Sequence, residues 1–311
     1  VGFMKTGTTG TLAASISVGK LLGLNSSKLV HAMGIAGFIL PISSRENMWG
    51  PTIKPFVGGQ AAKVGIEAAL LAQKGFTGCQ EIFMGTPPRY LGFCNLVSRE
   101  PALDKLTEGL GERYTILDVY FKPYAACRLS HSAIEAALTL VEENDILPDA
   151  VDRIEVKTFA RAAREIGGRY PEANSSFITC QFSLPYILAV VVSDRTIGPK
   201  QYRRQKISDP KIQEIAKKVQ VIPDDLMTSL YPEKAPARVK IFLRGGKAFE
   251  KQIDHHKWEP ERGIPKEEHL AKFHALASEI LPKERIEKID QIIDRLERLK
   301  RISTLIREAV L

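Results

Sequence analysis

The sequence has few cysteines and few aromatic residues, and it contains no long hydrophobic run. Its four cysteines are widely spaced and form no CxxC pair, so reduced thiols are expected rather than a disulfide framework. The longest apolar segments, such as 187–192, fall short of the roughly 18 residues that a membrane-spanning helix requires. No basic and apolar leader opens the sequence. We therefore expect a cytoplasmic protein that has no membrane partner.

Positive charge is in excess, with 44 Lys and Arg against 36 Asp and Glu, which gives a net charge of +8. Such an excess can attract nucleic acid, anionic lipid or a small polyanion. The basic residues gather near the C-terminus and around 203–206, where no aromatic residues are interleaved and no recognition motif occurs. We therefore predict no nucleic-acid partner. The spacings of His and Cys match no zinc rule, the His255-His256 pair included, so no metal site is predicted.

The first 110 residues carry the patterns of helices. Small and apolar residues recur at helical spacing, and glycines or a proline end the segments. The predicted helices span 10–22, 28–39, 59–74, 80–84 and 101–110. The first three are apolar on most sides, which is typical of helices packed closely against other helices.

The pattern then changes to a mixture of strands and helices. β-Branched and alternating residues predict strands at 114–122, 151–159 and 238–243, the last opening a hairpin that extends to 254. Helices are predicted between them at 130–142, 176–192 and 209–218. Because strands and helices do not alternate strictly, an α+β domain is indicated.

The C-terminal segment is again helical, over 266–279 and 283–307. An apolar stripe runs along the second helix from Ile286 to Ile302. We expect this stripe to pack on the helices of the first 110 residues. A coiled coil and a dimer contact remain alternatives.

Three segments carry candidate chemistry. Residues 2–10 place glycines, threonines and Lys5 at the start of a helix, where free backbone N–H groups can bind an anion or where the threonines only cap the helix. Lys54 lies among apolar neighbours, where a lysine is either functional or snorkels to the surface. Residues 122–131, KPYAACRLSH, crowd two cations, a thiol and an imidazole between a strand and a helix. Their ordinary roles are a solvated edge for the cations, a small buried hydrophobe for Cys127 and a backbone hydrogen bond for His131.

Six blocks occur in the same order as in a known family. They are GF-x-x-TG-x-x-GT-x-x-A at 2, TIKP-x-x-x-G-x-AA-x-x-G at 52, GFTG at 75, FKPY-x-x-CR-x-x-H-x-AI-x-A at 121, FSLPY-x-LA at 182 and AKF at 271. Together they resemble the MmgE/PrpD family, which includes 2-methylcitrate dehydratase and to which cis-aconitate decarboxylase and iminodisuccinate epimerase are similar. One block alone is weak, but six in order are specific for the family.

The resemblance implies a fold and an oligomeric state. It implies a multidomain α plus α+β protein, in which 1–113 and 266–311 form a helical domain and 114–265 form an inserted α+β domain. The active-site cleft is expected between the domains. A homodimer is expected, without a metal or an organic cofactor.

The resemblance also implies a substrate class and roles for residues. The substrate is expected to be a small di- or tricarboxylate such as 2-methylcitrate, dehydrated by proton abstraction next to a carboxylate; decarboxylation and epimerisation remain open. Lys54 and Lys122 fall on active-site lysines, and His131 on a histidine that can act as acid or base. Arg128 is expected to clamp a substrate carboxylate. The remaining predicted substrate contacts are Lys5, Thr6 and Cys127.

Two departures from the family pattern put catalysis in doubt. Met4 stands where the family commonly has histidine, and methionine cannot transfer a proton. The sequence opens at Val1, after the family's acidic and histidine-bearing first segment, so we expect it to be N-terminally incomplete. A weakly active or inactive relative that binds a polycarboxylate or acts as a subunit is therefore the alternative to a working lyase.

Overall fold

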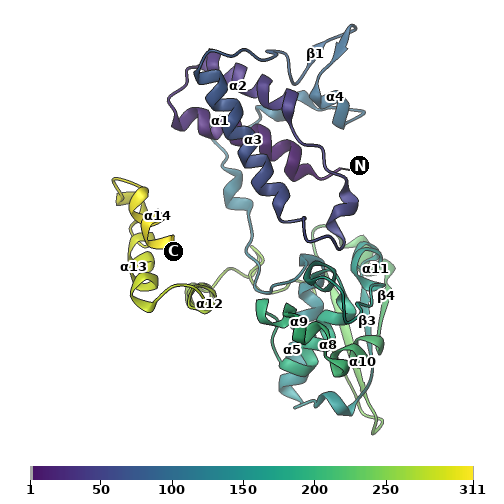
Figure 1. Ribbon diagram of the computed structural model, residues 1–311. Coiled ribbons are helices and arrows are strands. Elements are labelled where there is room, and N and C mark those ends of the chain that lie inside the picture. Colours follow the sequence, from purple (N-terminus) through teal and green to yellow (C-terminus); the bar gives the residue numbers. More distant parts are fainter. Residues whose placement is uncertain (1–2, 311) are drawn as a thin grey trace.

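The computed structural model describes residues 3–310 and separates the chain into three groups of elements (Figure 1). Helices α1 (Lys5–Leu21), α2 (Ser26–Ile39) and α3 (Phe56–Gln73) lie together at one end. A sheet with its covering helices lies at the other end, and α12 to α14 form a third group at the side. The fold is therefore rich in helix, with a small mixed sheet.

Close contact between α1 and α3 depends on small residues. A Cβ atom added at Gly65 would lie 2.4 Å from the Ala14 Cβ and 2.7 Å from the carbonyl oxygen of Thr11, so only glycine allows this approach. Both Gly23 and Gly75 have positive φ angles, of 69° and 94°, and end helices as predicted. The three predicted N-terminal helices are confirmed.

The segment from 76 to 121 differs from prediction. In place of helices over 80–84 and 101–110, it contains short elements only. These are β1 (Gly85–Thr86), β2 (Tyr90–Leu91), α4 (Phe93–Val97) and the 3-10 turn η2 (Leu103–Leu106). The strand predicted over 114–122 is also wrong, because this stretch holds the 3-10 turn η3 (Thr115–Asp118) with Ile116 and Leu117 exposed. β-Branched residues favour a strand only where a neighbouring strand pairs with it, and no such neighbour lies here among the described residues.

Four strands form the main sheet in the order β4-β3-β5-β6. Strand β3 (Val151–Thr158) pairs in parallel with β4 (Val219–Pro223) and antiparallel with β5 (Ala237–Leu243), which forms the predicted hairpin with β6 (Ala248–Ile253). The prediction had no strand at β4. The parallel pair and the hairpin make the sheet mixed, in agreement with an α+β fold.

Helices cover this sheet and bury the largest core of the described chain. At its centre is α8 (Leu184–Asp194), whose residues 184 to 192 are all buried. The neighbouring elements are α5 (His131–Glu143), α6 (Ala160–Ala162), the π turn η6 (Ala163–Gly167), α7 (Phe177–Gln181), α9 (Arg204–Ile207), α10 (Pro210–Lys217) and α11 (Asp225–Ser229). The single helix predicted over 176–192 is broken into α7 and α8, because the Ser183 hydroxyl caps α8 by accepting a hydrogen bond from the Tyr186 N–H.

The C-terminal helices contact the α+β region and one another. Helix α12 (Lys266–Ala277) agrees with prediction, whereas the helix predicted over 283–307 is divided into α13 (Lys283–Ile293), the turn η8 (Leu296–Arg298) and α14 (Ser303–Ala309). The break lets the apolar stripe fold back, so that α13 packs on α14 and buries Ile286 and Ile289. Whether both chain ends join in one helical domain stays a prediction. Within residues 3–310, no helix combines the length and the apolarity needed to cross a membrane.

Candidate anion-binding pocket

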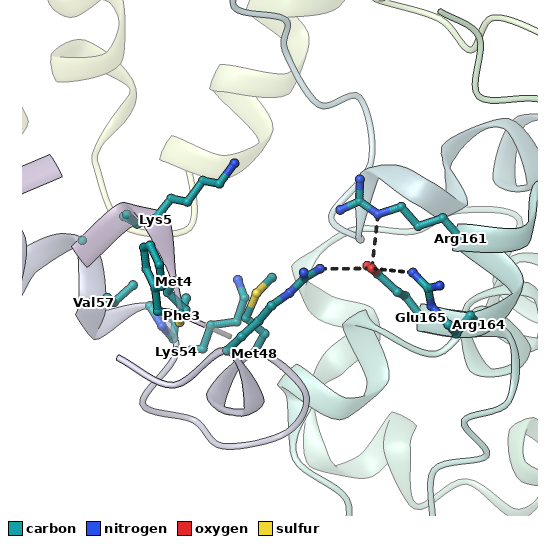
Figure 2. Close-up of a pocket in the computed structure, with 13 residues that line it drawn as sticks. Phe3, Met4, Lys5, Met48, Lys54, Val57, Arg161, Arg164 and Glu165 are labelled. Carbon is teal, nitrogen blue, oxygen red and sulfur yellow. Dashed lines mark hydrogen bonds and ion pairs between the residues drawn. The ribbon is translucent and has the colours of Figure 1, made fainter. Parts of the chain in front are cut away.

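A cavity of about 840 Å³ lies between the N-terminal helices and the π turn of the α+β region. It is lined by Phe3, Met4, Lys5, Thr6, Arg45, Met48, Lys54, Pro55, Val57, Gly58, Arg161, Arg164 and Glu165. Five of these residues are cationic and one is anionic. In Figure 2, Lys5 lies on one side of the pocket, whereas Arg161 and Arg164 meet Glu165 on the other. The pocket therefore favours a small molecule with several negative charges.

The first turn of α1 forms one wall. Helix α1 begins at Lys5, and Met4 before it provides no side-chain hydrogen bond to cap it. The positive end of the α1 helix dipole therefore lies beside Lys5 and Thr6, which line the pocket. The predicted capping role of the threonines is not observed, because Thr8 and Thr9 lie inside α1 and donate to the Lys5 carbonyl. Gly2, which opens the predicted anion-binding segment, lies outside the described residues.

Lys54 reaches the pocket from the turn that precedes α3. Its ammonium group lies 5.1 Å from the centre of the Phe182 ring, a favourable distance for a cation and an aromatic face. Phe182 belongs to the core of the α+β region. The lysine is therefore held between the two regions that form the pocket.

Arg45 and Glu165 connect the two walls directly. The guanidinium of Arg45, in the turn η1 (Arg45–Met48), lies 3.0 Å from a carboxylate oxygen of Glu165. Arg161 and Arg164 lie 3.2 and 3.8 Å from the same oxygen. Sequence reasoning missed these four residues, because they belong to no motif and Arg45 lies 120 positions from Glu165.

The lysine of the KPYAACR segment is electrostatically connected to the pocket, although it does not line it. The Lys122 ammonium donates a 3.2 Å hydrogen bond to the Ala126 carbonyl. Partial desolvation lowers the pKa of Lys122, as does the positive charge of Lys54, whereas Cys127 opposes the shift. Burial raises the pKa of Cys127, so its thiol stays protonated.

His131 and Arg128 face a different group of residues. His131 is fully buried, with its Nε2 atom 3.4 Å from the Ala126 carbonyl and its ring 4.8 Å from that of His256. Burial, followed by the charges of His256 and Lys122, lowers the pKa of His131 well below its usual value, so the imidazole is neutral. Arg128 forms an ion pair with the buried Glu259. Neither residue lines the pocket, and their predicted roles as acid or base and as clamp stay predictions.

Glu259 is the centre of an ion-pair network that the sequence did not reveal. Its carboxylate lies 3.1 Å from His256 Nε2 and 3.2 Å from His255 Nδ1. Burial raises the pKa of Glu259, but His256 and Arg128 more than offset this and lower it to about 2. His255, Glu259 and Glu261 bring their polar atoms within 4.8 Å of one another. Because the Arg128 guanidinium already neutralises this carboxylate, the cluster fits an ion-pair network better than a divalent metal.

Of the seven predicted site residues, the structure brings Lys5, Thr6 and Lys54 together in the pocket. Met4 also lines the pocket, where its side chain is buried. Lys122 and Cys127 are outside the lining but within electrostatic reach.

The structure is thus a helix-rich protein with a pocket lined by an excess of positive charge. Sequence comparison shows that the chain belongs to the MmgE/PrpD family: the model of the MmgE/PrpD N-terminal domain matches residues 1–105, and that of the MmgE/PrpD C-terminal domain matches residues 124–298. It is similar to cis-aconitate decarboxylase of Aspergillus terreus, with 26% identity over 314 residues, covering 96% of this chain and 62% of the relative.

Two mammalian cis-aconitate decarboxylases are similar to the chain to about the same extent. Cis-aconitate decarboxylase of Mus musculus is 26% identical over 312 residues, covering 96% of this chain and 60% of the relative. The Homo sapiens protein is 27% identical over 308 residues, covering 95% and 60%. The chain thus spans about three-fifths of the length of the curated relatives that it matches.

Proposed function

We propose that the pocket binds a small di- or tricarboxylate, and that the chain belongs to a lyase that eliminates water or carbon dioxide next to a carboxylate. One observation carries the proposal: five cationic side chains and an uncapped helix N-terminus surround a cavity that contains a single carboxylate. Such a site compensates the charge of a polycarboxylate. The similarity to cis-aconitate decarboxylases makes cis-aconitate a first substrate to test, and the resemblance of the sequence blocks to the family of 2-methylcitrate dehydratase adds 2-methylcitrate.

The chemistry of such an elimination also suits the lysines in and near the pocket. Loss of a proton or of carbon dioxide from the carbon beside a carboxylate leaves an electron pair on an already anionic molecule. The ammonium group of Lys54 lies in the pocket to stabilise this charge. Lys122 does not line the pocket, but its pKa is lowered, so it releases a proton more readily than a fully solvated lysine does.

Met4 supports a second candidate, in which this chain binds a polycarboxylate with little or no catalysis. The ionisable side chains of the lining, apart from the arginines, are Lys5, Lys54 and Glu165, and Glu165 is paired with arginines. A methionine in place of an imidazole removes the group best suited to general acid–base work at neutral pH.

Isothermal titration with citrate, cis-aconitate and 2-methylcitrate tests the proposal. We expect binding of at least one of them, weakened roughly tenfold or more in Lys54→Met, because a charged hydrogen bond in a pocket contributes about 1.5–3 kcal/mol. The control is Lys63→Met, which changes an exposed lysine of α3, the helix that follows Lys54, and which does not line the pocket. Absence of binding by every polycarboxylate, or equal effects of the two variants, would contradict the proposal. Product formation from cis-aconitate or 2-methylcitrate separates the lyase from the binding protein.

A further inference from the structure

We propose that Arg45, Arg161 and Arg164 form a subsite for one particular carboxylate of the ligand, and that Glu165 fills this subsite until the ligand arrives. The inference rests on the proposed function, since it assigns a specificity to the same pocket. It divides the pocket into two parts. Lys5, Lys54 and the start of α1 form one part, and the three arginines form the other.

The charges at the subsite are unbalanced. Three guanidinium groups lie within 3.8 Å of a single carboxylate oxygen of Glu165, so two positive charges remain uncompensated among these residues. The Glu165 side chain is only 11% exposed, whereas those of Arg161 and Arg164 are 44% and 75% exposed. The arginines therefore keep donors directed to solvent, which an incoming carboxylate can use.

The backbone and a neighbour hold these side chains in place. Arg164 and Glu165 lie in the π turn η6 (Ala163–Gly167), a rare conformation that is frequent at functional sites. The Arg161 guanidinium also donates a 2.7 Å hydrogen bond to the Tyr231 hydroxyl, which fixes its position independently of Glu165. The subsite is thus formed before a ligand binds, and part of the ordering cost is avoided.

Glu165 is suited to exchange with a ligand. Because the Arg45, Arg161 and Arg164 side chains are 38%, 44% and 75% exposed, water weakens their attraction to Glu165, and a ligand carboxylate can compete for them. Because Arg45 comes from the helical wall and Arg161 from the opposite wall, one carboxylate bound between them bridges both. A ligand with two further carboxylates, one for Lys5 and one for Lys54, then spans the pocket, whereas a dicarboxylate bound to the two lysines has no carboxylate left for the arginines. We infer that the subsite discriminates a tricarboxylate from the matching dicarboxylate.

Calorimetric titration with propane-1,2,3-tricarboxylate and with glutarate tests this inference, since the two differ by one carboxylate. At about pH 8 every carboxyl group is ionised. We expect Arg45→Met to weaken the tricarboxylate roughly tenfold and glutarate much less. We expect Glu165→Gln to tighten the tricarboxylate by about threefold or more, because the uncharged amide competes less strongly for the arginines than the carboxylate does.

The matched control is the ion pair between Arg195 and Asp145, which does not line the pocket and whose arginine is as exposed as Arg45, at 39% against 38%. Arg195→Met and Asp145→Asn should leave both affinities unchanged. Weaker tricarboxylate binding in Glu165→Gln, or equal losses for both ligands in Arg45→Met, overturns the subsite. If Lys54→Met abolishes binding while the Arg45 and Glu165 variants bind as the unaltered protein does, the subsite fails and the proposed function stands. If the unaltered protein binds neither ligand nor any other polycarboxylate, both fail.

Discussion

The ammonium group of Lys272 in α12 donates a 2.6 Å hydrogen bond to the backbone carbonyl of Lys122. This contact joins two residues 150 positions apart and lies next to the ring contact of Phe121 with His269, at 4.6 Å between centroids. Helix α12 therefore holds the backbone of Lys122 in place. Lys272 belongs to the AKF block that resembles the family. Its hydrogen bond to Lys122 is a structural role for the lysine of this block.

Replacing Lys272 by methionine should loosen the Lys122 segment. The loss of one charge-assisted hydrogen bond costs about 1–2 kcal/mol at a partly exposed site. Amide hydrogen exchange over 122–127 should therefore accelerate roughly tenfold. Lys272→Arg, which keeps a donor, should restore much of the protection, and Lys288→Met on the exposed face of α13 should change nothing there. Unchanged exchange in Lys272→Met would show that the bond does not order this segment.

Gly65 should tolerate no side chain. In Gly65→Ala the new methyl group would lie 2.4 Å from the Ala14 Cβ and 2.8 Å from the backbone nitrogen of Ser15, so α1 and α3 must separate. Overpacking of this kind costs about 1–3 kcal/mol. Gly59→Ala in the same helix meets no atom within 4 Å and should gain up to about 1 kcal/mol from helix propensity. Urea unfolding of both variants measures the difference, and equal midpoints would contradict the close packing of the two helices.

The buried imidazole of His131 should make stability depend on pH. Burial lowers its pKa in the folded protein, whereas the unfolded chain binds a proton below its ordinary value of about 6.5. The unfolded state then binds more protons, so stability is full above this value and falls as the pH drops below it. Between about pH 7.5 and about pH 5.5 the loss is roughly 1 kcal/mol.

His131→Phe keeps a ring against Tyr124 and His256 and should remove this part of the pH dependence. Glu259, with its pKa lowered to about 2, stays ionised over the same range and does not contribute to the difference. Denaturant unfolding at both pH values measures the change in the free energy of unfolding. An equal loss of stability in the variant and in the unaltered protein would mean that His131 is not kept neutral by the fold.

The N-terminal helices and the hairpin were predictable from local pattern. Small residues recur at helical spacing, and the glycines that end helices have positive φ angles, so sequence and structure agree at the level of single segments. The strand predicted over 114–122 failed because its residues find no strand to pair with. Strand β4, which lies parallel to β3, was missed for the converse reason, since its pairing is decided by tertiary contacts.

The residues of the candidate pocket also divide into those that the sequence predicted and those that only the structure revealed. Lys5, Thr6 and Lys54 lie in sequence blocks that resemble the family, so they could be predicted from the sequence. Arg45 and Glu165 are ordinary charged residues until the fold brings them to 3.0 Å. Charge pairs that connect distant segments leave no spacing rule in a single sequence, so this half of the pocket required the structure.

The hypothesis that Met4 impairs catalysis can be tested by a substitution that restores activity. Its side chain is buried at the pocket wall, and the backbone N–H donates a 2.9 Å hydrogen bond to the Ser43 carbonyl, so a substitution changes the side chain in a fixed backbone. Histidine at this position would supply an acid or base near neutral pH, which is typically worth about 10²- to 10⁴-fold. We therefore expect Met4→His to increase turnover of cis-aconitate or 2-methylcitrate by at least about tenfold.

Product formation under saturating substrate measures this gain, because turnover then depends on chemistry rather than on affinity. Met4→Gln, which is polar and similar in size but does not titrate near neutral pH, separates proton transfer from a mere change in polarity. An increase in Met4→His alone, with a pH profile that follows an imidazole, supports an impaired lyase. Efficient turnover by the unaltered chain would instead show that another group already transfers the proton, and that Met4 is no obstacle to catalysis.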